Sequence, residues 1–196
     1  MSAVRTLTLA DVAWPRVGLL RDAVLILAAS VVTALAAQIA IPLPWSPVPL
    51  TGQTFAVLLS GAVLGARRGF LAQIVYLSEG ASGLPFFAGG DAGIAKILGP
   101  TGGYLMAFPL AAAVTGFLAE RGWDRRFFTT YAALLIGSAV IFAGGLAWLA
   151  RFVPADRLLM SGLLPFIPGD LLKSALASAA FPAAWRWAHH RSGNGA

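Results

Sequence analysis

One stretch of this sequence constrains its fold more than any other: no charged residue occurs between Asp22 and Arg67. A helix that crosses the hydrocarbon layer of a membrane needs roughly 20 apolar residues, and this stretch is about twice as long. It must therefore fold back on itself. The four prolines of IPLPWSPVPL (41–50) mark the turn, because proline ends helices and favours turns.

The composition indicates that the whole chain lies in a membrane. Of its 196 residues, 58% are hydrophobic and only 11% are charged, whereas about a quarter of the residues in an ordinary soluble domain are charged. The formal net charge of +6 therefore indicates loops that face anionic lipid, and not a surface for nucleic acid. Cysteine is absent, and His189 and His190 both lie in the tail, which excludes thiolate sites and argues against a histidine-based metal site.

Six segments have the pattern of membrane-spanning helices, and we predict an all-α integral membrane protein. One membrane domain, residues 23–184, would lie between a cytoplasmic N-terminal segment (1–22) and a cytoplasmic tail (185–196). The second span is short, and the third ends close to Glu79. The predicted spans are 23–41, 50–66, 69–80, 102–119, 127–150 and 162–184.

The charges of the loops test this count, since lysine and arginine accumulate on the cytoplasmic side of a membrane. With six spans, ten arginines fall on the side of the two termini, and only Lys96, Arg151 and Arg157 fall on the other side. Both termini are therefore predicted to be cytoplasmic. The alternative is that residues 1–36 form a signal peptide, but its charged leader would be unusually long, and cleavage would disturb the pairing of the charged loops.

The two longer loops on the outer side differ in character. The first (41–53) is rigid, apolar and rich in proline, whereas the second (79–103) combines many glycines with Phe86, Phe87 and a few charges. Glycine allows tight turns and close approach to a ligand, and aromatic rings supply flat apolar contact. The second loop is predicted to be either a lid or a re-entrant loop that packs on lipid headgroups.

Asp170 and Lys173 stand three residues apart in the last apolar segment, so they share one face of a helix. Trp185, Arg186 and Trp187 form an interfacial anchor at its cytoplasmic end. At about 1.5 Å per residue, Lys173 lies roughly 18 Å and Asp170 roughly 22 Å from this anchor, within a hydrocarbon layer of about 30 Å. Either Asp170 caps the helix and Lys173 extends to the interface, or both face a solvated cavity that binds a polar ligand.

Small residues repeat every four positions along the first span, as Ala29, Thr33 and Ala37 and as Ser30 and Ala34. Such stripes let helices approach closely in lipid. They indicate either packing within the chain or contact with a second membrane protein.

Catalytic patterns are absent from the sequence. It contains no G-x-x-x-x-G-K-[ST] motif for nucleotide phosphates, and its apolar part has no serine–histidine or carboxylate pair. We therefore predict that the chain is not an enzyme and does not hydrolyse ATP itself.

Four blocks of the sequence, in this order, resemble the BioY family, the biotin-binding S components of energy-coupling factor (ECF) transporters. The resemblance covers about residues 25–180. The blocks are AQIAIPLPWSPVPLTGQTFAVLLSGAVLGARRG (37–69), GLPFFAGGDAG (83–93), GPTGGYLMAFPLAA (99–112) and PFIPGDLLK (165–173).

This resemblance implies a six-helix subunit of the bacterial cytoplasmic membrane that binds biotin and needs no cofactor. The pocket would lie near the outer face, closed by the loops after the first and third spans. A transmembrane coupling protein and two ATPases would supply the energy. The alternatives are the same architecture with another vitamin as ligand, or a biotin carrier that works alone. The expected contacts with the coupling protein are Ala29, Ser30, Thr33, Ala34 and Ala37.

The resemblance also assigns Asp170 and Lys173 as the polar ligand contacts, and the chemistry of biotin suggests the others. The carboxylate of Asp170 would accept from the ureido N–H groups of biotin, and the ammonium of Lys173 would donate to its carbonyl. Aromatic rings would cover the apolar parts, and loop amides or Lys96 would bind the biotin carboxylate. Asn194 is the only asparagine, so the loop after the third span cannot supply an asparagine side chain. The other expected contacts are Tyr76, Phe86, Phe87, Gly89, Gly90 and Asp91, with Trp45 as a further aromatic candidate.

Overall fold

The structure, a computed structural model, is mostly helical. It describes residues 7–15 and 18–193, with side chains described as far as residue 188. In this part of the chain, six helices of more than ten residues lie at the positions of the six predicted segments. They are α2 (Leu19–Gln38), α3 (Gln53–Leu64), α4 (Ala66–Ala81), α6 (Gly102–Ala119), α7 (Phe127–Leu149) and α9 (Ile167–Gly193).

The last helix differs most from its predicted limits. It begins at Ile167 rather than at residue 162, because a short helix, α8 (Leu158–Gly162), and a turn come first. It then continues to Gly193, so the segment that we expected to be a separate tail prolongs the helix. Two further short helices, α1 (Leu9–Ala13) and α5 (Ile94–Leu98), were not predicted.

Within the described residues, three helices are long and apolar enough to cross a membrane: α2, α6 and α7. α3 is apolar but has only 12 residues, which corresponds to about 18 Å of helix. α4 and α9 carry charged residues, among them Arg67 and Glu79 in α4 and Lys173 in α9. The chain is therefore a multi-pass membrane protein with three spans that are clear from length and composition alone.

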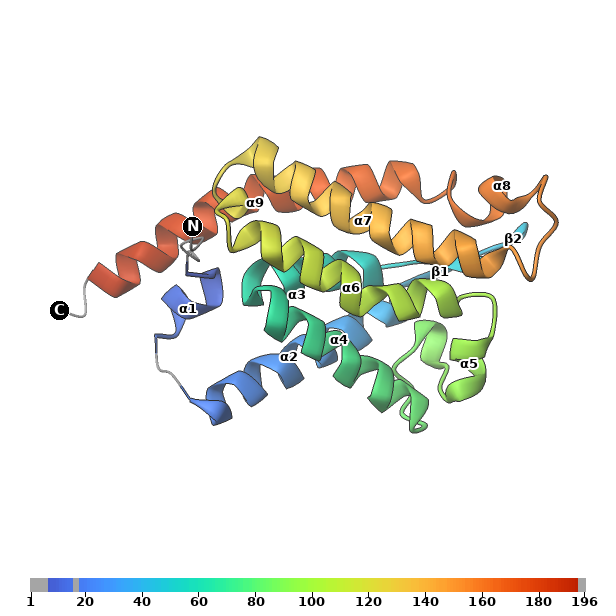
Figure 1. Cartoon of the computed structure of the whole chain (residues 1–196), viewed down its shortest axis with the longest axis horizontal. Coiled ribbons are helices and arrows are strands. Elements are labelled where there is room, and N and C mark those ends of the chain that lie inside the picture. Colours follow the sequence, from blue (N-terminus) through green and yellow to red (C-terminus); the bar gives the residue numbers. More distant parts are fainter. Residues whose placement is uncertain (1–6, 16–17, 194–196) are drawn as a thin grey trace, which may run out of the picture.

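Figure 1 shows the longer helices side by side, roughly along the long axis of the molecule. α1 and the C-terminal part of α9 lie at one end of the bundle, which we call the terminal end. The two β-strands, α5 and α8 lie at the opposite end, which we call the loop end. α6 packs against α3, α4 and α7 and forms the centre of the bundle.

A two-stranded antiparallel hairpin takes the place of the turn expected after the first span, so the fold is mostly helical and the all-α prediction was wrong in this detail. Its strands are β1 (Ala40–Leu43) and β2 (Ser46–Thr51). Proline is tolerated in them because both strands of a two-stranded sheet are edges. Val48 is buried in the core, and the Ser46 hydroxyl donates to the Ser161 carbonyl of α8 at 2.5 Å. The hairpin thus crosses the loop end, and this hydrogen bond fixes it to α8.

Glycine lets α3, α4 and α6 cross closely. A Cβ at Gly61 would lie 2.2 Å from the carbonyl oxygen of Ala112, and one at Gly69 would lie 2.8 Å from Gly61. Toward the loop end the core becomes aromatic, and Tyr76 stacks on Phe108 with ring centroids 6.4 Å apart.

Charged side chains at the terminal end pair with one another. Arg68 of α4 contacts Asp11 of α1 at 2.7 Å and Asp22 of α2 at 2.9 Å. Arg21 contacts Asp11 at 3.2 Å and donates to the Ala10 carbonyl at 2.7 Å. Burial opposes ionisation of Asp11, but hydrogen bonds from Thr8 and Arg68 and the charge of Arg68 hold its pKa below the ordinary value. These four charged residues, Asp11, Arg21, Asp22 and Arg68, are called the terminal ion cluster below.

A second polar contact at the terminal end fixes α9. The indole nitrogen of Trp185 donates to the buried carboxylate of Asp124 at 2.8 Å, and the guanidinium of Arg125 covers the Trp185 ring, 3.3 Å from its centroid. Burial raises the pKa of Asp124 above its ordinary value, although Trp185 and Arg125 oppose this shift. Arg125 also donates to the Leu7 carbonyl at 3.0 Å, which links the segment before α1 to the start of α7.

Candidate functional site

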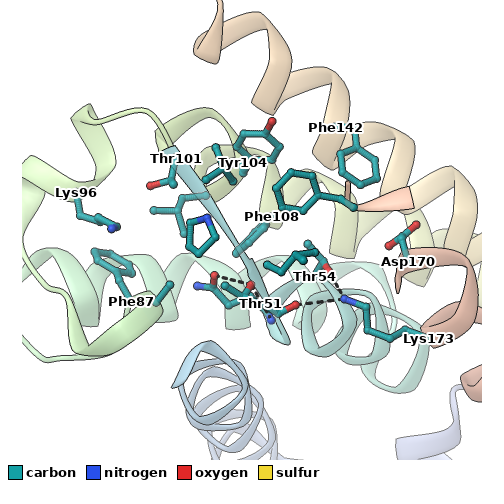
Figure 2. A pocket seen from close by; sticks show the side chains of 17 residues that line it. Thr51, Thr54, Phe87, Lys96, Thr101, Tyr104, Phe108, Phe142, Asp170 and Lys173 are labelled. Atoms are coloured by element: carbon teal, nitrogen blue, oxygen red, sulfur yellow. Dashed lines mark hydrogen bonds between the residues drawn. The ribbon is translucent and has the colours of Figure 1, made fainter. Parts of the chain in front are cut away.

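A cavity lies at the loop end, between α3, α6, α7, α9, β2 and the loop that follows α4 (Figure 2). Its wall is mostly apolar and aromatic, and Lys96, Asp170 and Lys173 contribute the charges. Such a combination, an apolar pocket with a few convergent polar groups, is typical of sites that bind small molecules. The lining residues are Val48, Pro49, Leu50, Thr51, Gln53, Thr54, Phe87, Ala88, Lys96, Thr101, Tyr104, Leu105, Phe108, Phe142, Phe166, Asp170 and Lys173.

Asp170 is the fourth residue of α9, so it lies inside the helix and is not its N-cap. The residue is 8% exposed, and its side chain lines the cavity. The Ser138 hydroxyl of α7 donates to its Oδ1 at 3.0 Å. A carboxylate has about four acceptor sites, so this single side-chain bond orients Asp170 and leaves most of its capacity for a ligand.

Lys173 also points into the protein rather than toward the membrane interface. Its Nζ donates to the Thr51 carbonyl at 3.2 Å and approaches the Thr54 hydroxyl at 3.5 Å (Figure 2). In the part of the chain that the structure describes, its ammonium makes no ion pair with Asp170, although the two share a helix face. The third ammonium proton is therefore available to a ligand in the cavity.

Lys96 lies on the opposite side of the cavity from Lys173, as Figure 2 shows. It belongs to α5, in the loop that was predicted to be either a lid or a re-entrant loop, and its Nζ contacts the Asp91 carboxylate of the same loop at 2.5 Å. Asp91 itself lines a neighbouring groove together with Gly89 and the hairpin, and Lys96 borders both spaces. The cavity thus has a cationic group at each side and apolar surface between them.

Phe87 forms the part of the cavity wall that the loop after α4 supplies. Its side chain is fully buried, and its ring packs directly on Gly80, where an added Cβ would lie 2.3 Å from a ring carbon. The Gly93 amide donates to the Gly80 carbonyl at 2.7 Å, which closes the loop onto the end of α4. Gly89 and Gly90 have φ values of 73° and 81°, a backbone conformation that residues other than glycine rarely adopt.

Tyr76 lies behind the wall rather than in it. It is fully buried, its hydroxyl accepts from the Gln53 side chain and donates to the Phe86 carbonyl at 3.1 Å, and its ring meets Phe87 edge to face. Phe86 packs on the same core, next to Phe87. Tyr76 and Phe86 therefore support the cavity wall, and contact with a ligand would fall to Phe87.

The structure brings together Asp170, Lys173, Phe87 and Lys96 from the predicted set, while Gly89 and Asp91 lie in the adjoining groove and Trp45 is exposed at the tip of the hairpin. Sequence reasoning missed several lining or supporting residues. Gln53 gave only a weak signal, as a polar residue at the start of an apolar segment that could line a cavity. Ser138 gave no signal, because a serine is not unusual in a membrane helix. The missed residues are Thr51, Thr54, Thr101, Tyr104, Phe108, Ser138, Phe142 and Phe166.

The small residues of α2 pack within the chain in this structure. Ser30, Thr33, Ala34 and Ala37 are buried, and only Ala29 of the predicted partner interface is half-buried. α2 packs on α4 along this face, and the Gln73 side chain of α4 donates to the Thr33 hydroxyl at 3.3 Å. The packing alternative therefore accounts for these four positions in the structure as it stands.

Comparisons with known proteins give results that agree with one another. The model of the BioY family matches residues 5–190. A Pyrococcus horikoshii protein named "Probable biotin transporter BioY" is 47% identical over 145 residues, which cover 74% of this chain and 84% of the relative. A Rhizobium etli protein named "Biotin transporter BioY" is 37% identical over 167 residues, which cover 81% of this chain and 89% of the relative.

One solved structure has the same fold. It is described as the S component for biotin from an ECF-type ABC transporter, and it superposes with a TM-score of 0.77 at 26% sequence identity. The match covers 85% of this chain and 92% of that chain.

Proposed function

Because this chain belongs to the BioY family, we propose that it is the S component that binds biotin for uptake, energised by ECF partner subunits. Its relatives are named as transporters, and the chain is accordingly a transport protein and not an enzyme. Biotin is its ligand and not a cofactor.

The arrangement of charges around the cavity supports this ligand most directly. Biotin has a ureido ring with two N–H donors and a carbonyl at one end, a carboxylate at the other end, and an apolar bicycle and tail between them. Asp170 and Lys173 lie together on one side of the cavity and Lys96 on the other (Figure 2). We assign the ureido ring to the Asp170–Lys173 side and the carboxylate to the Lys96 side, with Phe87 and Phe108 against the apolar parts.

The Lys96 side replaces the missing loop asparagine in this proposal. Release of Asp91 from Lys96 would free the ammonium for the biotin carboxylate, and the amides around Gly89 and Gly90 would add donors. Asp91 then acts as an internal substitute for the ligand carboxylate. The Asp91 side chain in this ion pair is 55% exposed and that of Lys96 is 27% exposed, so the exchange of one carboxylate for another costs little.

We further propose that all six longer helices span the bacterial cytoplasmic membrane, with both termini in the cytoplasm. The excess of arginine in the loops of the terminal end supports this orientation. It turns the loop end, with the cavity under the hairpin and the loop after α4, toward the outside. The ligand would thus be taken from the outer face.

A coupling protein and two ATPases would drive release to the inside. Contact through Ala29 requires little change, because its side chain is half-buried, whereas contact through Ser30, Thr33, Ala34 and Ala37 requires α2 to move away from α4. The proposed partner interface therefore includes a separation of these two helices.

Calorimetric titration of the purified protein with biotin and a panel of other vitamins tests the function. We expect biotin to bind with a dissociation constant below about 1 µM, that is, at least about 8 kcal/mol, and the other vitamins to bind far more weakly. Tight binding of another vitamin alone would support the same architecture with a different ligand. Biotin accumulation by vesicles that contain only this chain would show a carrier that works alone.

A further inference from the structure

A chain of hydrogen bonds, buried at its centre and partly buried elsewhere, runs from the Lys173 side of the cavity to the loop after α4. Lys173 donates to the Thr51 carbonyl at 3.2 Å, and the Thr51 hydroxyl donates to Gln53 Oε1 at 3.1 Å. The Gln53 amide nitrogen donates to the Tyr76 hydroxyl, which donates to the Phe86 carbonyl at 3.1 Å. The chain therefore joins α9, β2, α3, α4 and the loop.

The direction of each bond in this chain is fixed. A tyrosine hydroxyl has one proton, and Tyr76 places it on the Phe86 carbonyl, so Tyr76 must accept from Gln53. The Gln53 amide is thereby oriented, with its nitrogen toward Tyr76 and its oxygen toward Thr51. Gln53 is 5% exposed and Tyr76 is fully buried, so neither can replace a lost partner by bulk water.

The chain ends next to the aromatic wall of the cavity. Phe86 precedes Phe87, whose ring lines the cavity, packs on Gly80 and meets the Tyr76 ring edge to face with centroids 5.7 Å apart. The Tyr76 hydroxyl thus holds the backbone, and the Tyr76 ring supports the side chain that faces the ligand.

We propose that Gln53 and Tyr76 are positioning residues that hold the Phe86–Phe87 segment over the bound ligand and link it to occupancy at Lys173. The inference rests on the proposed function, since it assumes that a ligand accepts the free proton of the Lys173 ammonium. A ligand bound there restrains Lys173 and hence the Thr51 backbone, which positions the Thr51 hydroxyl that donates to Gln53. The hydrogen bonds of Gln53 and Tyr76 are called the bridge below. Loss of the bridge therefore raises the dissociation rate of the ligand more than it lowers the association rate.

The test uses the full-length protein in lipid nanodiscs with the variants Tyr76→Phe and Gln53→Met. Association and dissociation rates of biotin are measured by stopped flow, and amide hydrogen exchange of residues 84–91 is measured without ligand. We expect the dissociation rate to rise about 5- to 20-fold with the association rate within about twofold, as for loss of a buried hydrogen bond. We also expect faster exchange in residues 84–91 in both variants.

Two matched variants separate positioning from stability. Tyr131→Phe removes a hydroxyl near the start of α7, at the terminal end, and is expected to change neither readout. Gln73→Met removes a buried amide that bonds Thr33 and Ser60, away from the cavity, and is expected to lower the melting temperature without changing the ratio of the two rates.

Three results would overturn the proposal: unchanged dissociation in both bridge variants, unchanged exchange of residues 84–91, or the same rate changes in Gln73→Met. If Tyr76→Phe does not fold, Gln53→Met decides alone, because it breaks the same bridge from the other side. If the wild-type protein binds no biotin, the proposed function fails. The hydrogen exchange of the ligand-free protein still decides whether the bridge holds the loop.

Discussion

The terminal ion cluster and the Asp170–Lys173 pair of the loop end use charged residues in opposite ways. At the terminal end, Arg68 bridges Asp11 and Asp22. At the loop end, Asp170 and Lys173 lie on one helix face, but the first is held by Ser138 and the second by Thr51. Charges that satisfy one another fix helices in place, whereas charges that are held apart by neutral groups keep donors and acceptors for a ligand.

The largest expected effect concerns the charges that are held apart. Asp170→Asn and Lys173→Ala should each weaken biotin binding by about 10- to 100-fold, because a hydrogen bond to a charged group contributes about 1.5–3 kcal/mol. Calorimetric titration measures the affinity, and thermal unfolding checks that both variants fold.

The controls for this prediction are charges at the same end that lie outside the cavity. Asp156→Asn and Arg157→Ala alter exposed residues of the loop before α8 and should leave the affinity within about twofold, since exposed charges contribute little. Wild-type affinity in Asp170→Asn would show that the charges of both ends serve the fold.

The converse prediction concerns the terminal ion cluster. Arg68→Met should lower the free energy of unfolding by about 1–2 kcal/mol, since it leaves two partly buried carboxylates with the longer ion contacts to Arg21 at 3.2 and 3.6 Å. The biotin affinity should stay at the wild-type value. A lower biotin affinity without a lower melting temperature would contradict the view that the terminal ion cluster stabilises the fold and does not serve the ligand.

A smaller effect is expected where a neutral residue holds a charge. Ser138→Ala should weaken biotin binding about fivefold, corresponding to about 1 kcal/mol for the bond that orients Asp170. Ser138→Thr keeps the hydroxyl and should restore most of the affinity. Equal affinities of the alanine and threonine variants would contradict an orienting role for the hydroxyl.

The smallest effect is a pH dependence of stability at the terminal end. Because the pKa of Asp11 is lowered in the folded protein, its ionised form stabilises the fold above the ordinary pKa of about 3.9, and this contribution is lost as the pH falls through the lowered pKa. Melting temperatures measured below pH ~4 should therefore fall more steeply for the wild type than for Asp11→Asn.

Asp124 should behave in the opposite way. Its raised pKa means that its stabilising contribution is present below the ordinary pKa and lost as the pH rises through the raised pKa. The melting temperature of Asp124→Asn relative to the wild type should therefore increase as the pH rises above about 4. The same slope for both variants would contradict the different surroundings of these two carboxylates.

Sequence patterns located the helices well, because long apolar segments can satisfy their backbone in a membrane only as helices. Asp170 and Lys173 were found for the same reason, since a charge inside such a segment is costly and therefore conspicuous. The hairpin was not predicted, because its prolines signal an end of helix and do not reveal which backbone groups pair afterwards.

The supporting residues of the site were harder to find from the sequence. Tyr76 was expected to touch the ligand, but its place behind Phe87 depends on how α4 packs against α6, which no local pattern encodes. Likewise, the stripe of Thr33 and Ala37 allows close packing without showing the partner, and in the structure α2 packs mainly on α4, where Gln73 donates to Thr33. Ser138 acquires its role only from its distance to Asp170.

The prolines of the hairpin also solve a problem of solvation. A two-stranded sheet leaves the outer edge of each strand unpaired, and an unpaired backbone N–H needs water, which becomes scarcer toward the hydrocarbon layer of a membrane. Pro42, Pro47 and Pro49 carry no N–H, so the hairpin has fewer donors to hydrate. Their fixed φ angles also reduce the entropy that the unfolded chain loses when the hairpin forms. A rigid hairpin with few backbone N–H donors can therefore cover an apolar cavity without a helix above it.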